Sequence, residues 1–371
     1  MTGTARSASA PRTFTRLLVT GGAGFIGSNF VHRTLATRPD VQVAVLDALT
    51  YAANTDNLLA DDGRPLEEAY PGRFRFIKAD ISDATAVAAA LDSVVGSEGS
   101  SEADAAAAAE TAIVHFAAES HNDNSLHDPG IFARTNVEGT VNLAEAACTH
   151  GVHLHHVSTD EVFGDLALDE PRRFTVDTPY NPSSPYSASK AAADHFIRAF
   201  VRSRGLKATI SNCSNNYGPR QHPEKFIPRQ VTGLLEGHQP RLYGTGENVR
   251  DWIHVDDHND AVWTILERGE VGSTYLIGAE GERSNKQVVE DLLEIFDRPS
   301  DDYVHVTDRP GHDRRYAIDP ASTRALGWKP QYTQFRQGLQ ATVDWYADHR
   351  QWWRVARVAS EEKYRRTERE I

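Results

Sequence analysis

The chain has 371 residues, of which 40% are hydrophobic and 25% charged, as in ordinary soluble globular proteins. Its formal net charge of −13 argues against a nucleic-acid-binding or membrane-surface protein, because both need a positive field. The two cysteines, Cys148 and Cys213, give neither a disulfide framework nor zinc-ligand spacing, so we expect no metal site and a reducing, cytoplasmic location. No apolar run approaches the roughly 20 residues that a membrane helix needs.

Both ends of the chain are expected to be flexible tails. Residues 1–13 are rich in Ser, Thr, Ala and Arg and have no apolar core, so they are not a secretory signal. Residues 360–371 form a charged run that is typical of a frayed, solvated helix.

The first predicted element is a strand at 17–20, which a glycine-rich turn joins to a helix. The turn residues of interest are Gly21, Gly24, Phe25, Ile26 and Gly27. Gly21 permits the tight turn, Gly24 lets the backbone approach a pyrophosphate, and Gly27 lets helix and strand pack closely. An ordinary tight turn is the alternative interpretation.

The apolar run 41–46 is predicted to be the second strand, and it ends in Asp47. An acid at this place can accept hydrogen bonds from both ribose hydroxyls and repels a 2′-phosphate, which favours NAD over NADP. Further strands at 74–77, 112–116, 152–157 and 206–211 alternate with helices, and the segment 94–111 is expected to be a helix end and a solvent loop. This alternation predicts a parallel, doubly wound α/β sheet.

Several residues follow these strands at the edge of the sheet where such folds bind ligands. Asp80 and Ile81 could flank an adenine, and small residues after the fourth strand would let the chain pass close to a cofactor. The candidates that follow the fourth strand are Phe116, Ala117, Ala118, Ser120 and His121.

Two short patterns carry candidate catalytic groups. Thr159, Asp160 and Glu161 follow the fifth strand, and Tyr186 and Lys190 are four residues apart, so they share one face of a helix. Each pattern alone is more simply a solvated loop or a helix surface. Their order behind a dinucleotide-binding turn favours catalysis.

The chain changes character after about residue 180, where Pro and Gly separate short elements and basic residues gather. We expect a dinucleotide-binding domain at 14–220, to which a strand and helix at about 250–268 return, and a smaller, mixed α/β substrate domain mainly at 221–355. Helices are expected at 288–296 and 335–353. The basic residues suggest a site for an anion such as a substrate phosphate, with scattered surface arginines as the alternative; they are Arg220, Lys225, Arg229, Arg241, Arg250, Arg309, Arg314 and Arg315.

From about 16 to 353, the chain resembles the extended short-chain dehydrogenase/reductase superfamily and, within it, the dTDP-glucose 4,6-dehydratase family. The resemblance rests on the glycine turn, on Tyr-x-x-x-Lys, and on the runs FAAESH, STDEV, NPSSPY, SNNYGP, HPEKFIP, RDWIHVDDH and RPGHDRRYAID. The Thr-Asp-Glu triplet is the most specific of these, because related epimerases lack the acid pair. Departures from the usual pattern occur at Asn122, Asn124, Phe163 and Arg220.

The resemblance implies a Rossmann-type fold and a redox-neutral dehydration of dTDP-glucose by tightly bound NAD, which is regenerated at each turnover. Tyr186 would be the base for the O4 proton, supported by Lys190, and both would also contact the cofactor. Thr159 would orient O4, ionised Glu161 would take the C5 proton, and protonated Asp160 would donate to the departing O6. The implied substrate-binding residues are Ser120, His121, Thr159, Asn215, Lys225, Phe226, Ile227, Arg250, Asn285 and His312.

The resemblance also implies a homodimer, formed as a four-helix bundle by the Tyr-x-x-x-Lys helix and the helix before it. The product would supply deoxysugar synthesis, such as that of dTDP-rhamnose. A nucleotide-sugar 4-epimerase of the same superfamily is the alternative function, and a catalytically silent NAD-sensing protein is a more distant one.

Overall fold

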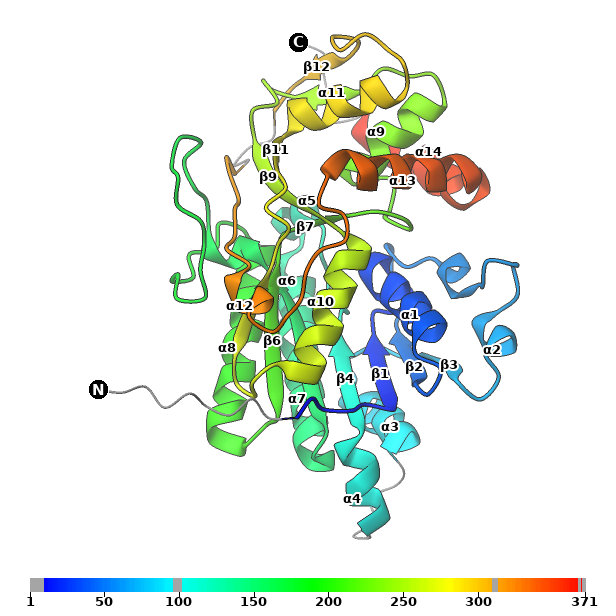
Figure 1. Cartoon of the computed structure of the whole chain (residues 1–371), viewed down its shortest axis with the longest axis vertical. Helices are drawn as coiled ribbons and strands as arrows, with labels where there is room; N and C mark the ends of the chain where they lie inside the picture. The colour runs from blue at the N-terminus through cyan, green and yellow to red at the C-terminus, as the bar shows by residue number, and fades with distance from the viewer. Residues whose placement is uncertain (1–9, 96–101, 309–312, 366–367, 369–371) are drawn as a thin grey trace.

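The structure, a computed structural model, describes residues 10–95, 102–308, 313–365 and 368. Its central element is a seven-stranded sheet in which every neighbouring pair of strands is parallel (Figure 1). This sheet confirms the predicted Rossmann-type fold. In spatial order the strands are β10 (Thr274–Ile277), β6 (Ala208–Cys213), β5 (His153–Thr159), β4 (Thr111–His115), β1 (Arg16–Thr20), β2 (Gln42–Asp47) and β3 (Phe74–Lys78).

The register of the strands brings their carboxyl ends to one edge of the sheet. Thr20 at the end of β1 pairs with Leu46 of β2 and with His115 of β4. The order of the strands reverses direction at β1, so a crevice opens there between the turns that follow β1 and β4. Many of the predicted site residues follow these strand ends, and others lie in helices.

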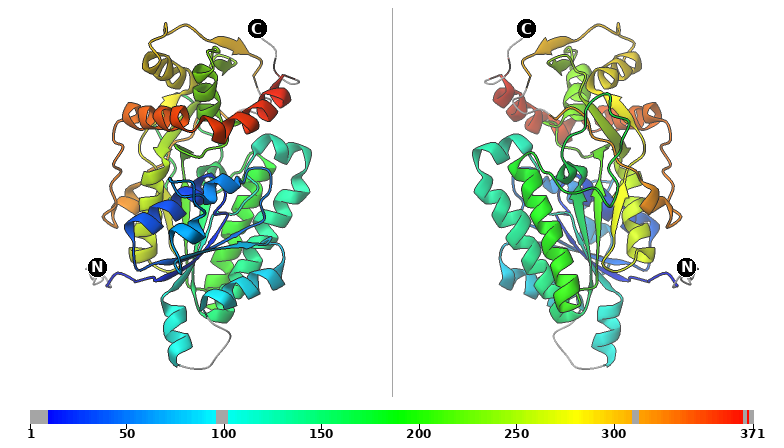
Figure 2. Two further views of the ribbon diagram at one scale, coloured as in Figure 1. Left: turned by 90° about the vertical axis from the view of Figure 1, so that its right-hand side faces the viewer. Right: turned by 90° about the vertical axis from the view of Figure 1, so that its left-hand side faces the viewer.

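Helices cover both faces of the sheet, so nearly all side chains of its central strands are buried (Figure 2). On one face lie α1 (Phe25–Thr37) and α10 (Val255–Arg268), and α12 (Ala321–Arg324) contacts β10. On the other lie α3 (Ala84–Val95), α7 (Gly139–His150) and α8 (Pro185–Arg204). The remaining elements of this part are η1 (Thr55–Leu58), α2 (Leu66–Ala69), α4 (Glu102–Ala109), α5 (Asn122–His127), α6 (Pro129–Phe132), the π-helical turn η2 (Ala133–Glu138) and η3 (Asp160–Phe163).

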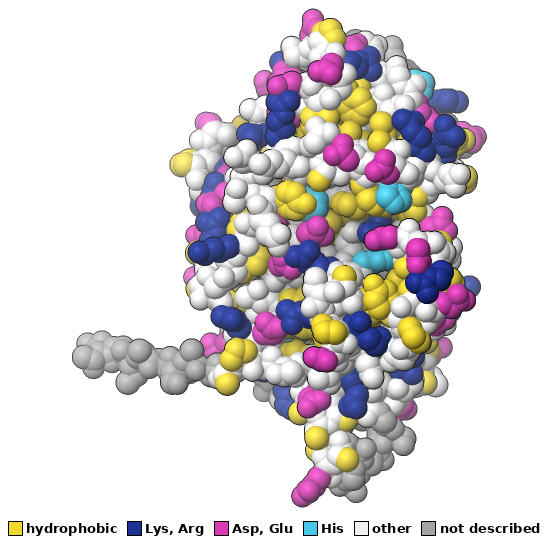
Figure 3. All heavy atoms as spheres, turned by 45° about the vertical axis from the view of Figure 1, so that its right-hand side comes forward, with side chains coloured by type: hydrophobic (Ala, Val, Ile, Leu, Met, Phe, Trp, Pro, Cys, Tyr) yellow, Lys and Arg dark blue, Asp and Glu magenta, His cyan; other side chains and the backbone are white. Residues whose placement is uncertain are grey.

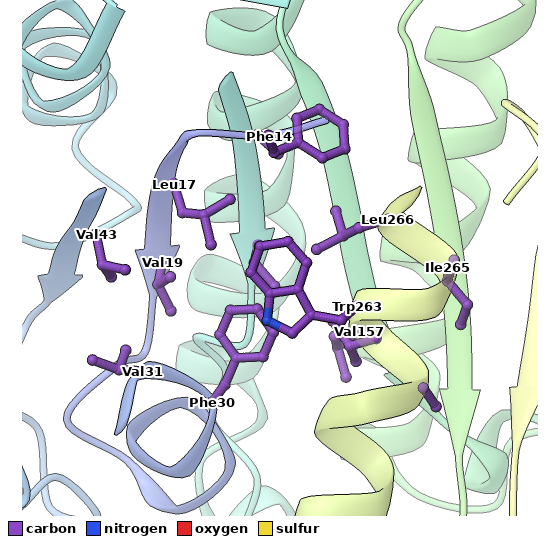
Figure 4. Close-up of a cluster of buried hydrophobic side chains, with 14 of the residues drawn as sticks. Phe14, Leu17, Val19, Phe30, Val31, Val43, Val157, Trp263, Ile265 and Leu266 are labelled. Carbon is purple, nitrogen blue, oxygen red and sulfur yellow. The ribbon is translucent and has the colours of Figure 1, made fainter. Parts of the chain in front are cut away.

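The first core cluster joins the N-terminal strand to a helix more than 200 residues later in the chain. Figure 4 shows Trp263 of α10 close to Phe30 of α1, beside Leu17 and Val19 of β1. The rings of Trp263 and Phe30 are stacked with centroids 5.7 Å apart, and the indole N–H donates to the Thr34 hydroxyl at 2.9 Å. Burial of an aromatic side chain of this size stabilises a fold by about 2 kcal/mol or more, so α10 is an integral layer of the sheet domain.

The smaller part of the molecule lies beyond the carboxyl edge of the sheet (Figure 1). It has a core of its own, built around Trp353, Tyr346 and Leu292. Its strands are β7 (Asn215–Tyr217), β9 (Val249–His254) and β11 (Glu282–Ser284) in one sheet and β8 (Arg241–Tyr243) and β12 (Val304–Val306) in another. Its helices are α9 (Phe226–Leu235), α11 (Asn285–Ile295), α13 (Phe335–Asp348) and α14 (Arg350–Tyr364).

Four sequence-based expectations need correction. Of the pair expected to return at 250–268, only α10 joins the main domain, because β9 pairs with β7 and β11 and the seventh strand of the main sheet is β10. The helix expected over 335–353 is two helices that meet at His349. The segment 94–111 contains the expected helix end, which is that of α3, but also the helix α4 and the start of β4.

The fourth correction concerns the expected tails. The backbone and side chain of Arg12 donate to carbonyls of Glu267 and Leu266, so the described end of the N-terminal segment is attached to α10. Residues 360–364 continue α14, and Tyr364 is buried. Residues 1–9, 96–101, 309–312, 366–367 and 369–371 lie outside the described part of the chain.

The described surface carries both signs of charge. On the face drawn in Figure 3, acidic and basic side chains are interspersed and form no single-sign patch. Within the described residues, no helix is long and apolar enough to cross a membrane, and no three or more His, Cys, Asp or Glu side chains are grouped as metal ligands.

Candidate active site

Two adjoining cavities lie at the carboxyl edge of the main sheet. The first, of about 340 Å³, extends from the glycine turn to Tyr186 and Lys190. The second, of about 290 Å³, extends from the same region into the smaller part of the molecule. Both are lined by Ser120, Glu161, Asn215, Asn216, Gln221 and Lys225, so they meet at these side chains. A long ligand could therefore span the two.

The glycine turn between β1 and α1 fits a bound pyrophosphate. Gly21 has a φ of +72°, and a Cβ on it would lie 2.6 Å from the backbone nitrogen of Ala117. A Cβ on Gly27 would lie 2.2 Å from the Gly21 carbonyl oxygen, so helix and turn pack too closely for any side chain. Gly24 precedes the first turn of α1, with no side chain to cap its N–H groups, which leaves them available to a phosphate.

The end of β2 places a carboxylate beside this turn. Asp47 is buried and accepts hydrogen bonds from the backbone N–H of Ala23 at 2.9 Å and of Leu49 at 2.8 Å. Burial raises its pKa, while these two hydrogen bonds oppose the shift. All the predicted cofactor residues line the first cavity: Gly21, Gly24, Phe25, Ile26, Gly27, Asp47, Asp80, Ile81, Phe116, Ala117, Ala118, Tyr186 and Lys190.

The helix α8 holds Tyr186 and Lys190 in place. It begins with a capping box in which Ser184 and Ser187 bond each other's backbone N–H, with Pro185 at the first helical position. Lys190 is buried, and its Nζ donates to the Val157 carbonyl of β5 at 2.8 Å. Burial lowers the pKa of Lys190 to about 8. Burial and the charge of Glu161 raise the pKa of Tyr186 well above its ordinary value.

The Thr-Asp-Glu triplet lies where β5 passes into η3. The Thr159 hydroxyl accepts a hydrogen bond from the Glu161 N–H at 3.3 Å and so caps η3. Glu161 lines both cavities, whereas Asp160, which is fully buried, lines neither. Oδ1 of Asp160 accepts from the Thr159 hydroxyl at 3.3 Å, and its Oδ2 has no partner among the described residues.

Burial raises the pKa of both acids of the triplet, but not to the same extent. Burial and the neighbouring Glu161 raise the pKa of Asp160 well above its ordinary value. Burial raises the pKa of Glu161 to about 7, and the positive charges of Arg250 and Lys225 oppose this shift. Burial therefore favours the protonated form of Asp160, whereas the pKa of Glu161 lies close to neutrality.

The second cavity brings together the predicted substrate residues. Ser120, His121, Asn215, Lys225, Phe226, Ile227, Arg250 and Asn285 all line it, while Thr159 lines the first cavity. His312 lies outside the described residues. Arg250 is buried and lies over the ring of Tyr316, with Cζ 4.5 Å from the ring centroid. His121 Nε2 lies 3.4 Å from a carboxylate oxygen of Glu224, and both side chains are buried.

Comparison with known proteins identifies the group to which this site belongs. A family model described as GDP-mannose 4,6 dehydratase matches residues 18–342. A dTDP-glucose 4,6-dehydratase of Mycobacterium tuberculosis is 56% identical over 350 residues, which cover 94% of this chain and 98% of that protein. The chain belongs to the dTDP-glucose 4,6-dehydratase family.

Solved structures of this dehydratase family have the same fold. DesIV, a dTDP-glucose 4,6-dehydratase from Streptomyces venezuelae solved with NAD bound, matches with a TM-score of 0.80 and 44% identity, over 92% of this chain and 99% of that one. A UDP-glucose 4-epimerase from Thermotoga maritima matches with a TM-score of 0.76 and 26% identity, over 90% of this chain and 99% of that one. The fold is thus shared with epimerases, and the higher identity lies with the dehydratases.

Sequence reasoning missed several residues of the dehydratase-like site. Asn122 donates through Nδ2 to Glu161 at 3.1 Å, so a position noted only as a departure from the family pattern contacts the triplet. Asp313 and Tyr316 line the second cavity, and their side chains hydrogen-bond each other. Both lie in the run RPGHDRRYAID, which matches the family pattern and could have indicated them. The run alone, however, does not show which of its side chains face a cavity.

The basic residues do not form one anion site. Lys225, Arg229 and Arg250 line the second cavity, whereas Arg314 pairs with Asp165 and Arg315 with Glu282. Arg220 lies near Asp61 and Arg241 near Glu368, while Arg309 lies outside the described residues. The alternative of dispersed arginines therefore holds for most of this group.

Proposed function

We propose that this protein converts dTDP-glucose into dTDP-4-keto-6-deoxy-glucose and water, with NAD as a cofactor that is regenerated within each turnover. The observation that carries the proposal is the pair Asp160 and Glu161, whose pKa values burial raises to different extents beside Tyr186 and Lys190. Elimination of water needs one proton donor and one proton acceptor. A 4-epimerase has no use for this acid pair.

The first step would be oxidation at C4 of the glucose. Bound NAD would accept hydride from C4 and later return it to C6, and its cationic ring would lower the pKa of the nearby phenol. Tyr186 would take the proton of O4, and the positive charge of Lys190, one helical turn further on, would stabilise the phenolate. The hydroxyl of Thr159, whose hydrogen bond with Tyr186 opposes the rise of the Tyr186 pKa, would orient O4.

The second step would be loss of water across C5 and C6. The C4 ketone acidifies the C5 proton, which ionised Glu161 would remove as the C6–O6 bond breaks. Asp160 would give its proton to O6, so that water leaves; because Asp160 lines neither cavity, its carboxyl group would have to turn towards the bound hexose for this step. The resulting C5=C6 double bond would receive hydride at C6 and the proton from Glu161 at C5. The different pKa values of the two acids support this division of roles.

The nucleotide half of the substrate would occupy the second cavity. Lys225 and Arg250 would pair with the diphosphate through charge-assisted hydrogen bonds. Asn215 and Asn285 would offer amide groups to phosphate or sugar. The walls of this cavity would be formed by Phe226 and Ile227 of α9, together with Ser120 and His121. The family resemblance suggests His312 as a further substrate-binding residue.

The activity is tested by incubating the purified protein with dTDP-glucose and assaying the alkali-induced absorbance of a 4-keto sugar. We expect a strong signal with dTDP-glucose and a weaker one with UDP-glucose at equal concentration. Recovery of dTDP-galactose without a deoxysugar would support the epimerase alternative, and no conversion at all would refute both.

We also propose a homodimer in which α7 and α8 of two copies form a four-helix bundle. The two helices pack against each other on the outer face of the sheet (Figure 2). Along α8, the exposed residues Ala188, His195, Phe196 and Ala199 form one stripe, and Phe196 is 42% exposed. Small residues beside an exposed ring permit close approach of a second helix.

Light scattering tests this assembly. Phe196→Asp should convert a dimer into a monomer, because it places a charge in the apolar contact. Val355→Asp, at a valine on α14 that is 82% exposed, is the matched control and should leave the mass unchanged. A monomeric wild-type protein, or a Phe196→Asp variant that stays dimeric, would contradict the proposal.

Finally, we propose a cytoplasmic location and a role in supplying deoxysugars, such as dTDP-rhamnose. The free thiols of Cys148 and Cys213 support a reducing compartment. Cell fractionation, with loss of the deoxysugar on deletion of the gene, would test both.

A further inference from the structure

Asp194 is a buried carboxylate that the proposed mechanism does not use. It lies on α8 one turn after Lys190 and is fully buried. Its Oδ2 accepts from the Tyr180 hydroxyl at 2.7 Å and from the Asn212 amide at 3.1 Å, and its Oδ1 lies 3.2 Å from Nε2 of His156. A carboxylate so far from water is costly unless it is well compensated, so its presence needs a reason.

Two of these partners lead directly to catalytic candidates. The Asn212 side-chain amide also donates to the backbone carbonyl of Thr159, at 3.1 Å, where the triplet begins. His156 precedes Val157, whose carbonyl accepts the hydrogen bond from Lys190 Nζ. Asp194 therefore links α8, which carries Tyr186 and Lys190, to β6 and to β5.

The protonation states around Asp194 follow from its partners. Burial acts to raise the pKa of Asp194, but the contacts with His156 and Tyr180 and the charge of Lys190 keep it below its ordinary value. Burial and Lys190 lower the pKa of His156 to about 4, so His156 is neutral. Burial lowers the pKa of Lys190, and the charge of Asp194 is the strongest influence that opposes this shift.

We propose that Asp194 is a positioning residue, whose negative charge lies one helical turn from Lys190 in the dry interior and whose hydrogen bond with Asn212 fixes Thr159 relative to Tyr186. The inference rests on the proposed dehydratase function and extends it to a residue behind the reacting groups. Asp194 touches neither cavity, so its action is indirect.

The other ionisable groups around this pair do not substitute for Asp194. His156 of β5 and His115 of β4 are neutral, because burial lowers the pKa of both. The Cys213 thiol of β6 is neutral, since burial raises its pKa to about 12. Tyr180 is a neutral donor that also accepts from Arg198, at 2.7 Å. On the side towards the substrate, Asp160 and Glu161 of η3 act on Tyr186.

The test is Asp194→Asn, which keeps the shape and removes the charge. Without that charge Lys190 loses its proton at lower pH, so the alkaline limb of kcat/KM should move to lower pH. We expect kcat at neutral pH to fall about 10- to 100-fold, with the KM for dTDP-glucose changed less than about threefold. An alkaline limb at the wild-type pH, or an unchanged kcat, would overturn the proposal.

Two further variants separate charge from folding. Asp92→Asn removes a carboxylate that pairs with the His150 side chain at 2.7 Å, between α3 and α7, and should leave the pH profile unchanged. Asn212→Ser removes the link to Thr159 but keeps the Asp194 charge, so kcat should fall about 10-fold while the alkaline limb stays in place.

The pair of variants also covers the case in which Asp194→Asn fails to fold. A normal kcat in Asn212→Ser would then overturn the positioning role. If the wild-type protein does not act on dTDP-glucose, the proposed function fails and this inference falls with it. An active wild-type protein with an unaltered Asp194→Asn profile overturns the inference alone.

Discussion

Glu161 and Asp160 are neighbours in the chain, yet their surroundings differ in a way that chemistry can use. Glu161 lies where the two cavities meet, near the positive charges of Arg250 and Lys225, which keep its pKa close to neutrality. Asp160 lies deeper, near Asp251 as well as Glu161, and both carboxylates raise its pKa further. One acid is thus ready to accept a proton and the other to donate one.

Glu161→Gln should block elimination and leave C4 oxidation intact, because the amide cannot remove the C5 proton. We expect kcat to fall by about 10² to 10⁴ while enzyme-bound NADH accumulates. The measurement is the near-ultraviolet absorbance of NADH after mixing with dTDP-glucose. As a control, Tyr186→Phe should slow the first hydride transfer itself and accumulate little NADH. Normal turnover by Glu161→Gln would show that the base is misassigned.

The activity should also fall on the acidic side of neutrality. Glu161 must be ionised to act, and its pKa is raised to about 7, so kcat/KM should decrease as the pH drops below about 7. The charge of Asp313 contributes to this raised pKa. Asp313→Asn should therefore move the acidic limb to lower pH. A limb that moves to higher pH would contradict the assignment.

At the scale of elements, the β1–α1 turn predicts different effects for two similar glycine substitutions. A Cβ at position 27 would meet the Gly21 carbonyl oxygen at 2.2 Å, whereas a Cβ at position 24 would meet the same oxygen at 3.3 Å. Gly27→Ala should therefore destabilise the fold itself by about 1–3 kcal/mol. Gly24→Ala should lose NAD affinity with a nearly normal Tm of the NAD-free protein.

Thermal unfolding and NAD titration of both variants provide the measurement. Equal losses of stability in the two would contradict the distinction. An unaffected NAD affinity in Gly24→Ala would mean that the backbone there does not approach the cofactor.

The helix α14 is held to α9 by a buried arginine. Arg229 is 4% exposed, and its guanidinium bonds the carboxylates of Glu361 and Glu368 and lies 3.7 Å above the ring of Tyr364. Because Arg229 also lines the second cavity, its ion pairs with the C-terminal segment help to fix one wall of the proposed substrate site. The C-terminal segment, which the sequence suggests is a solvated tail, therefore contributes to the fold.

Glu368→Gln should lower the free energy of unfolding by about 1–3 kcal/mol, because a buried cation loses one of its two charged partners. The KM for dTDP-glucose should rise as Arg229 relaxes. Glu247→Gln, at an exposed position shortly before β9, is the control and should change stability by less than about 0.5 kcal/mol. Equal stability of the two variants in chemical denaturation would contradict the argument.

At the scale of the whole molecule, the sequence predicts the sheet domain well, because short apolar strands, turn glycines and helices alternate at regular spacing. The catalytic candidates could be proposed from the sequence because they follow strand ends or share a helix turn. The sequence did not predict that β10 belongs to the main sheet. This short strand pairs with β6, but the chain first passes through the smaller part of the molecule and α10. Long-range pairing of this kind leaves no local pattern.

The same limit applies to the side chains around the site. Asp194 and Asn212 look like ordinary polar residues in a helix and a strand, and only the tertiary structure brings them to one point behind Thr159. Asp160 was expected in the cavity and lies just behind its wall. Burial of a particular carboxylate depends on packing between distant segments, which the sequence pattern does not encode.

The most direct test of the whole account follows one hydrogen atom through the reaction. With dTDP-glucose deuterated at C4, the account predicts a 4-keto-6-deoxy product whose deuterium is bound to C6, as read by mass spectrometry and NMR. Deuterium that is lost to solvent, or that remains at C4 of recovered hexose, would contradict a reaction in which a single active site oxidises C4, eliminates water and returns the same hydride.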